Sequence, residues 1–208
     1  MLIGIMADSH GEAGSLRAVL GYLAGLGCEA LVHLGDVCDS GWPGTVDECV
    51  GLLRDAGALV VKGNNDHLVV KNNEDWPESP VSRGSLDWLR ALPARLDRFG
   101  ASFVHSQPFV EMMGLSAMVR SMEEAEYRAY FSQEPGGILF RGHSHDPALA
   151  RPRQGGVRVR GVPAGEVMEL SRKRPCAITC GSLMQGFAML YDDRALRVTC
   201  LRMEGAGG

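Results

Sequence analysis

Seven side chains able to bind a metal ion recur at the ends of predicted strands. The strands are short apolar runs at Leu2–Ala7, Ala30–Leu34, Ala58–Val61, Ala101–Val104 and Ile138–Phe140. The side chains just beyond them are Asp8 and His10, Asp36, Asn64, His105, and His143 and His145. In open α/β sheets, ligands bind beyond the carboxyl ends of the strands. The sequence therefore predicts that four of its six histidines gather in one region together with carboxylates.

This set of donors fits two adjacent metal ions better than one. A protein zinc ion usually takes three or four ligands, whereas seven suit two ions that share a bridging carboxylate. Two-metal sites with ions ~3.5–4 Å apart act on phosphoryl groups, and a hydroxide between the ions is a nucleophile near neutral pH. Imidazole, carboxylate and amide donors suit Mn²⁺, Fe, Zn²⁺ or Ni²⁺, and we place Mn²⁺ first. Each motif alone also has a structural interpretation, since Gly-Asp is an ordinary turn and Asp8 or Ser9 can cap a helix.

The elements that would position these residues begin as alternating strands and helices. An apolar stripe at helical spacing predicts a helix over Ser15–Leu26, and the flanking strands then form a parallel pair with a right-handed crossover. Further helices are expected at Thr45–Asp55, at Ser85–Leu92 and from about 114 to 131. Beyond His145 the pattern changes to short antiparallel strands. These strands are predicted at Val157–Val162, Cys176–Thr179, Gly186–Tyr191 and Leu196–Leu201.

Length and composition are those of an ordinary soluble globular chain. The 208 residues predict a single domain over 1–208 with a loose tail at about 204–208. The formal net charge of -4 argues against a broadly basic surface, so long nucleic acid is not an expected partner. No apolar run reaches the ~20 residues that span a membrane, and no signal peptide is expected at the start. We therefore predict a cytoplasmic protein with six reduced cysteines.

The order Asp-x-His, Gly-Asp, Gly-Asn, His and Gly-His-x-His resembles that of the calcineurin-like metallophosphoesterases. It is most similar to the small prokaryotic members of the phosphodiesterase type. The resemblance implies an α/β fold in which two mixed β-sheets pack as a sandwich flanked by helices. It also implies that Asp36 bridges two metal ions. The first ion would then be held by Asp8, His10, Asp36 and His145, and the second by Asp36, Asn64, His105 and His143.

One position departs from the pattern of many family members, which carry histidine directly after Gly-Asn. This chain has Asn65 there, and asparagine can donate a hydrogen bond but cannot act as a general acid. General acid catalysis contributes roughly 10²–10⁴-fold, so esters with poor leaving groups should react slowly unless another group helps. The departure favours phosphodiesters, or activated esters, over protein phosphatase activity.

Four residues are candidates for catalytic roles beside the ligands. His67 is a candidate replacement for the missing acid, although a surface histidine is the plainer interpretation. Asp66 is expected to orient a ligand histidine, as groups around metal ligands often do. Asn65 and Arg141 are expected to contact phosphate, although Arg141 also fits a neutral surface role. The loop Cys38–Gly44 and the segment Gln107–Phe131 are expected to line the pocket.

The leading hypothesis is a metal-dependent phosphoesterase with two metal ions, most simply a phosphodiesterase acting on a small phosphate ester or nucleotide. A metal-bridging hydroxide would attack phosphorus in line. An alternative is a nucleotide pyrophosphatase or dinucleoside polyphosphate hydrolase, which the long loop after Asp36 would allow. A nuclease acting on short oligonucleotides is also open. A non-catalytic scaffold on the same fold is disfavoured, because every ligand position is filled. The sequence makes no prediction of oligomeric state.

Overall fold

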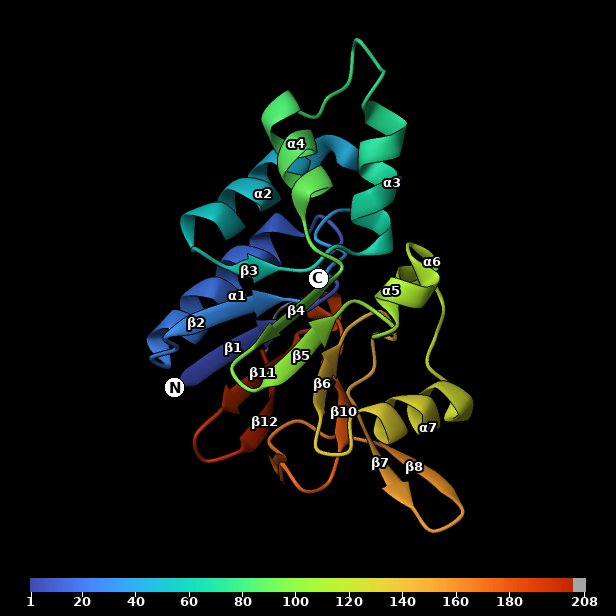
Figure 1. The fold of residues 1–208 in the computed structure, drawn as a ribbon. Coiled ribbons are helices and arrows are strands. Elements are labelled where there is room, and N and C mark those ends of the chain that lie inside the picture. Colours follow the sequence, from blue (N-terminus) through green and yellow to red (C-terminus); the bar gives the residue numbers. More distant parts are fainter. Residues whose placement is uncertain (204–208) are drawn as a thin grey trace.

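Two six-stranded mixed sheets lie face to face in the computed structural model, which describes residues 1–203 (Figure 1). The predicted loose tail at 204–208 lies outside the described residues. The first sheet has the strand order β3-β2-β1-β11-β12-β9, with β3 Leu59–Val60, β2 Ala30–His33, β1 Leu2–Met6, β11 Phe187–Asp192, β12 Arg197–Arg202 and β9 Val167–Glu169. The second has the order β4-β5-β6-β10-β7-β8, with β4 Arg95–Arg98, β5 Ala101–Val104, β6 Ile138–Arg141, β10 Cys176–Thr179, β7 Ala148–Arg153 and β8 Gly156–Gly161.

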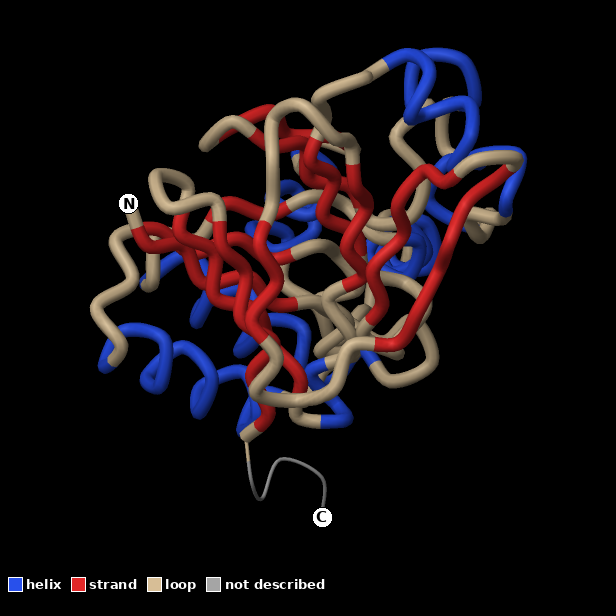
Figure 2. Tube along the Cα trace, turned by 90° about the horizontal axis from the view of Figure 1, so that it is seen from below, coloured by secondary structure: helices blue, strands red, loops and turns tan. Residues whose placement is uncertain are grey.

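Helices cover the outer faces of both sheets, with strands between them (Figure 2). On the first sheet pack α1 Ala13–Gly25, α2 Val46–Asp55, α3 Asn64–Asn73 and α4 Arg83–Ala91. On the second lies α7 Glu124–Gln133, preceded by the short helices α5 Val110–Met113 and α6 Ser116–Val119. Single-turn 3₁₀ helices lie at Pro43–Thr45 and Leu183–Gln185. The predicted sandwich of two mixed sheets flanked by helices is confirmed.

The interior between the sheets is apolar and joins them directly. The rings of Phe103 and Phe140, from neighbouring strands of the second sheet, stack with centroids 5.3 Å apart. Phe140 also contacts Tyr191 of the first sheet at 5.0 Å between centroids. Burial of such aromatic surface is a large favourable term in folding, and it fixes how the sheets face each other.

Parallel strands at the centre of each sheet aim their carboxyl ends at one region. In the first sheet β1, β2 and β3 run parallel, and in the second β5, β6 and β10 do. The segments directly after β1, β2, β3, β5 and β6 carry the seven predicted metal ligands. Strand topology thus brings side chains 137 positions apart in the sequence, from Asp8 to His145, to one place.

The structure departs from the predicted elements in several places. Strand β10 was expected in an antiparallel set, but it pairs parallel with β6 and antiparallel with β7, because it enters the sheet between them. The helix expected at about 114–131 is divided, since the side-chain hydroxyl of Ser106 donates to the carbonyl of Arg120 and holds that segment extended. Helix α3 was not predicted, because its asparagine-rich sequence has low helix propensity.

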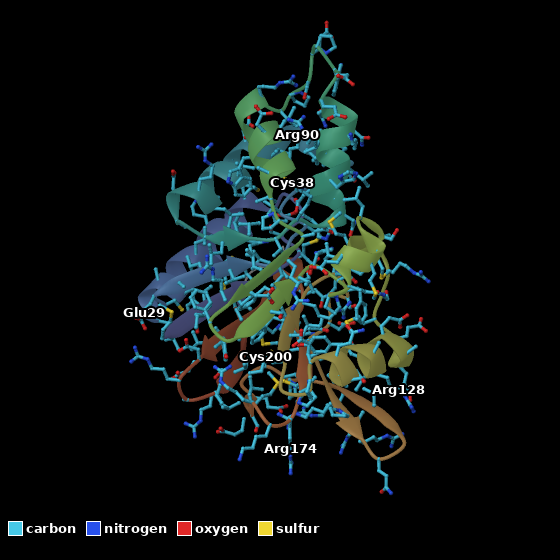
Figure 3. All side chains as sticks on the ribbon, viewed as in Figure 1. Glu29, Cys38, Arg90, Arg128, Arg174 and Cys200 are labelled. Atoms are coloured by element: carbon cyan, nitrogen blue, oxygen red, sulfur yellow. The ribbon has the colours of Figure 1, made fainter. Side chains whose placement is uncertain are left out.

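The six cysteines are free thiols, and all except the half-buried Cys28 are buried. Cys38 and Cys200 lie inside the molecule, whereas Glu29, Arg128 and Arg174 extend from its periphery (Figure 3). Within residues 1–203, the helices are all too short or too polar to cross a bilayer.

Candidate metal centre

The predicted ligands of the first metal ion converge where the two sheets meet. One carboxylate oxygen of Asp8 and ring nitrogens of His10 and His145 all lie within 4.8 Å of one another. The Nε2 atoms of the two histidines are 3.2 Å apart, although one residue lies after β1 and the other after β6. These three donors have the spacing to surround one cation.

The predicted ligands of the second ion gather beside the first group. Donor atoms of Asp8, Asp36 and His105 also lie within 4.8 Å of one another. Nε2 of His105 is 3.0 Å from Oδ1 of Asn64 and 3.2 Å from Nδ1 of His143. All seven residues named from the sequence are therefore brought together.

Two carboxylates lie between the two groups. Asp8 has oxygens close to both sets of imidazoles. Oδ2 of Asp36 lies 3.9 Å from Nε2 of His10 and 3.5 Å from Nε2 of His105, so a single atom reaches both groups. Asp36 is therefore the residue with one oxygen that could contact a cation on either side.

Left-handed backbone presents most of these side chains. Residues other than glycine rarely adopt positive φ, and such positions cluster at functional sites. Because β1 ends at Met6, the backbone of the loop that follows it, and not the pleat of the strand, sets the directions of the Asp8 and His10 side chains. The five candidate ligands with positive φ are Asp8 (54°), His10 (44°), Asp36 (53°), His143 (67°) and His145 (53°).

Glycines let the ligand loops pack backbone against backbone. A Cβ on Gly63 would lie 2.1 Å from Oδ1 of Asp36, and one on Gly35 would lie 2.6 Å from the nitrogen of Gly63. No side chain fits at such distances. The Gly-Asp and Gly-Asn motifs are therefore needed to bring the loops after β2 and β3 into contact.

The tautomer of His105 shows that the donors fit a cation. Nδ1 lies 2.8 Å from the carbonyl oxygen of Leu34 and must carry the proton, so Nε2 presents a lone pair. Burial lowers the pKa of His105 to about 4, so the ring is neutral at pH 7. That lone pair faces oxygens of Asp36 and Asn64. Electron pairs directed at one another in a buried site repel, and a bound cation would turn the repulsion into coordination.

The pKa shifts in the site also agree with a bound cation. Burial raises the pKa of Asp8 well above its usual value, and the nearby charge of Asp36 raises it further. Burial also lowers the pKa of His143 and of His145. A cation reverses these effects for the carboxylates, while neutral imidazoles are already in the form that binds metals.

Asp66 supports the loop that carries Asp36, which corrects the prediction that it orients a histidine. Its Oδ2 accepts hydrogen bonds from the backbone N–H groups of Asp36 at 3.0 Å and Gly63 at 2.9 Å. Its Oδ1 accepts from the N–H of Cys38 at 3.1 Å. The carboxyl is fully buried, and its pKa is raised to about 7 by burial and by Asp36. Through these hydrogen bonds Asp66 holds the loops after β2 and β3 together.

Asn65 contacts the bridging carboxylate. Its backbone N–H donates to Oδ1 of Asp36 and its side-chain amide donates to Oδ2, both at 2.8 Å. Its own oxygen accepts from the hydroxyl of Ser40 at 2.8 Å, so the loop Cys38–Gly44 does reach the site. The phosphate contact of Asn65 stays a prediction. The observed bonds orient Asp36.

Arg141 lies beneath the site, which makes the predicted phosphate contact wrong. Its side chain is almost fully buried. Nε donates to the carbonyl of Ser106 at 2.9 Å, Nη1 to Oγ1 of Thr179 at 3.1 Å and Nη2 to Oγ of Ser144 at 3.1 Å. The guanidinium thus joins the segments after β5 and β6 to β10 and is enclosed by protein.

His67 lies one helical turn beyond Asn64 on α3 and is half-buried. It lines a small apolar pocket with Asn64, rather than the cluster of ligands itself. Burial lowers its pKa, and the positive charges of Lys62 and Lys71 lower it further. A histidine with a pKa below 6.5 is mostly neutral at pH 7, which weakens its case as a proton donor there.

One residue that supports the site, Ser9, was not predicted to do so. Ser9 was considered only as a helix cap, yet it is buried and its hydroxyl lies 3.0 Å from Nε2 of His33. His33 is fully buried, and both of its ring nitrogens are hydrogen-bonded. The placement of Ser9 between Asp8 and His10 was the available signal.

These features define a two-sheet α/β sandwich with a candidate centre for two metal ions. Residues 1–183 match the family description "Calcineurin-like phosphoesterase superfamily domain". The chain therefore belongs to the calcineurin-like phosphoesterase superfamily, as the order of its motifs had indicated.

Individual proteins resemble the chain at sequence identities below 30%. A crystal structure of a metallophosphoesterase from Sphaerobacter thermophilus has a TM-score of 0.80 at 24% identity, over 98% of this chain and 88% of that one. A structure described as a novel archaeal phosphodiesterase has a TM-score of 0.53 at 14% identity, over 98% and 100% of the two chains. These likenesses concern the fold. An uncharacterized protein of Methanocaldococcus jannaschii is 27% identical over 166 residues, 70% of this chain. The chain spans 63% of that relative, less than two thirds of its length.

Proposed function

We propose that this protein is a phosphodiesterase that depends on two divalent metal ions, with Mn²⁺ the favoured metal. The observation that carries the proposal is the convergence of seven donor residues into two adjoining groups around Oδ2 of Asp36. The proposed ligands are Asp8, His10, Asp36, Asn64, His105, His143 and His145. Family membership supports hydrolysis of a phosphoester.

Two divalent cations in such a centre supply a hydroxide nucleophile at neutral pH and neutralise charge on the phosphoryl oxygens. The residues of this chain provide the geometry. Asp8, Asp36 and His105 are buried and form the floor, whereas the His145 side chain is 39% exposed and faces the solvent from which a substrate arrives. Asn65 holds both oxygens of Asp36 in one orientation.

The residue directly after Asn64 favours diesters over monoesters with poor leaving groups. The amide of Asn65 cannot protonate a departing alkoxide. The reaction then depends on a leaving group that is stable as an anion, or on a proton donor elsewhere, for which His67 is the proposed candidate. A monoester dianion also brings more charge to the site than a diester does.

We treat the chain as one metallophosphoesterase domain, because the proposed ligands come from both sheets. A cytoplasmic location and the exclusion of long nucleic acid stay predictions from composition. The choice of Mn²⁺ over Fe, Zn²⁺ or Ni²⁺ rests on the donor types alone.

The test compares hydrolysis of bis-p-nitrophenyl phosphate with that of p-nitrophenyl phosphate. Metal-stripped protein is refilled with Mn²⁺, and Asp36→Asn and His105→Ala are measured beside Asp87→Asn, whose side chain is 60% exposed and remote from the ligands. We expect turnover of the diester that requires metal, disappears in the first two variants and survives in the third. Preference for the monoester would overturn the diesterase assignment. Failure to bind metal at all would favour a non-catalytic scaffold.

A further inference from the structure

A small apolar pocket adjoins the proposed second metal position. Its volume is about 150 Å³, and it lies between α3 and the segment containing α6, which are neighbours in Figure 1. The pocket is lined by Asn64, His67, Leu68, Leu115, Met118 and Val119.

Asn64 belongs to both the pocket and the metal centre. Its Oδ1 lies 3.0 Å from Nε2 of His105, so its side chain is part of the ligand cluster while it also forms one wall of the pocket. Val119, which also lines the pocket, has its backbone close to the imidazole of His143, another proposed ligand. A molecule with its phosphate at the metal centre would therefore have its nearest substituent at the pocket entrance.

The lining suits a flat apolar group of one ring. Met118 is buried at the base, while Leu68, Leu115 and Val119 are 43%, 53% and 58% exposed and present their apolar surface around it. Exposed apolar residues scattered singly are ordinary, but several around one hollow mark a binding site. A dry cavity of about 150 Å³ holds a benzene-sized ring. Whole ligands usually occupy 300–1,000 Å³, so the pocket has room for one substituent of a substrate.

We propose that this pocket binds one flat, ring-sized apolar substituent of the phosphoester whose phosphate lies at the metal centre. The inference rests on the proposed function and narrows the substrate class to esters that carry such a ring. The neutral imidazole of His67 on the pocket wall offers a face for stacking or a hydrogen bond to a heteroatom of the ring.

The test measures binding rather than turnover. Phenylphosphonate and methylphosphonate, which share the phosphonate group and differ in the ring, are titrated by calorimetry into Mn²⁺-loaded protein. We expect phenylphosphonate to bind about tenfold more tightly, because its ring leaves water for the pocket. In the double variant Leu68→Ser/Val119→Ser, the preference should fall to about twofold or less while the affinity for methylphosphonate is retained.

The matched control is Leu26→Ser/Val159→Ser, which changes the same residue types at exposed positions away from the pocket. It should keep the tenfold preference. Equal binding of the two phosphonates by the wild type, or a preference that survives in the pocket variant, would overturn the inference and leave the proposed function standing. If methylphosphonate fails to bind protein that holds its metals, the proposed function itself is overturned, and the inference with it.

Discussion

Nε2 of His33 and the hydroxyl oxygen of Ser9 lie 3.0 Å apart, and this contact ties together the loops that carry Asp8 and Asp36. The N–H of Gly35 donates to Nδ1 of His33 at 3.2 Å, so the ring proton is on Nε2 and is donated to Ser9. Ser9 in turn donates its hydroxyl proton to the carbonyl of Val37 at 3.1 Å. A neutral, fully buried imidazole thus completes a chain of hydrogen bonds beneath the metal centre.

Acid should therefore destabilise the metal-free protein partly through His33. Burial lowers the pKa of His33 to about 3, whereas an unfolded histidine titrates near 6.5. Between these values the unfolded state binds more protons, so the contribution of His33 is fully present above pH 6.5 and is lost as the pH falls toward 3. We expect His33→Gln to lower the free energy of unfolding at pH 7 by about 1–3 kcal/mol and to flatten its fall between pH 6.5 and 4.5.

The measurement is urea unfolding of metal-stripped protein across that pH range. His67→Gln is the matched control, because His67 is half-buried and its lowered pKa should contribute a smaller slope. Identical pH slopes for the wild type and His33→Gln would show that His33 does not carry the effect.

Removal of the Asp66 carboxylate should loosen the metal centre although no proposed ligand is substituted. Asp66→Ala leaves the N–H groups of Asp36, Cys38 and Gly63 without their acceptor, and each unsatisfied buried amide costs about 1–3 kcal/mol. We expect a loss of at least ~2 kcal/mol in the free energy of unfolding and weaker Mn²⁺ binding by equilibrium dialysis. Asp87→Ala, which removes an exposed carboxylate, should change neither quantity. Unchanged metal affinity in a folded Asp66→Ala protein would contradict this account.

The positions of the candidate ligands could be predicted from the sequence because residue chemistry and strand topology coincide there. Apolar runs mark the strands, and parallel strands bring the residues just beyond their carboxyl ends to one edge of the sheet. Seven side chains could therefore be grouped without coordinates. The pattern of residue types does not record backbone partners. Asp66 accepts hydrogen bonds from the backbone N–H groups of Asp36 and Gly63. The residues beside Asp66 in the sequence do not show whether its partner is a backbone amide or a histidine.

Arg141 was misplaced for a related reason. An arginine beside Gly-His-x-His suggests a phosphate contact, but strand β6 is central in its sheet and fully buried, so its last side chain points into protein.

Helix α3 was not predicted because tertiary contacts override its weak helix propensity. The N–H of Gly63 bonds to Asp66 at 2.9 Å, and Val69 and Val70 pack into the core beside α4.

Arg141→Met should therefore cost stability and leave substrate affinity nearly unchanged. The substitution keeps an unbranched side chain but removes the donors to Ser106, Thr179 and Ser144. We expect the free energy of unfolding to fall by at least ~2 kcal/mol. KM for bis-p-nitrophenyl phosphate should change less than about threefold, since removal of a group that does not touch substrate leaves uniform binding intact. Arg128→Met, on the exposed face of α7, is the control for loss of an arginine. A tenfold rise in KM with unchanged stability would restore Arg141 as a phosphate contact.

Asn65→His should change how the rate depends on the leaving group. In the wild type the amide at position 65 cannot donate a proton to a departing aryloxide, so rates across a series of aryl methyl phosphates should fall steeply as the leaving group becomes more basic. An imidazole at this position can donate that proton, and general acid catalysis contributes roughly 10²–10⁴-fold. The gain should appear with the most basic leaving groups and vanish with p-nitrophenoxide, which departs readily as an anion. The variant also loses the hydrogen bond from the side-chain amide to Oδ2 of Asp36, so rates with good leaving groups should fall.

Asn65→Ala isolates that loss, because it removes the same hydrogen bond without adding an acid. A Brønsted plot of equal slope for the wild type, Asn65→His and Asn65→Ala would show that position 65 takes no part in protonating the leaving group.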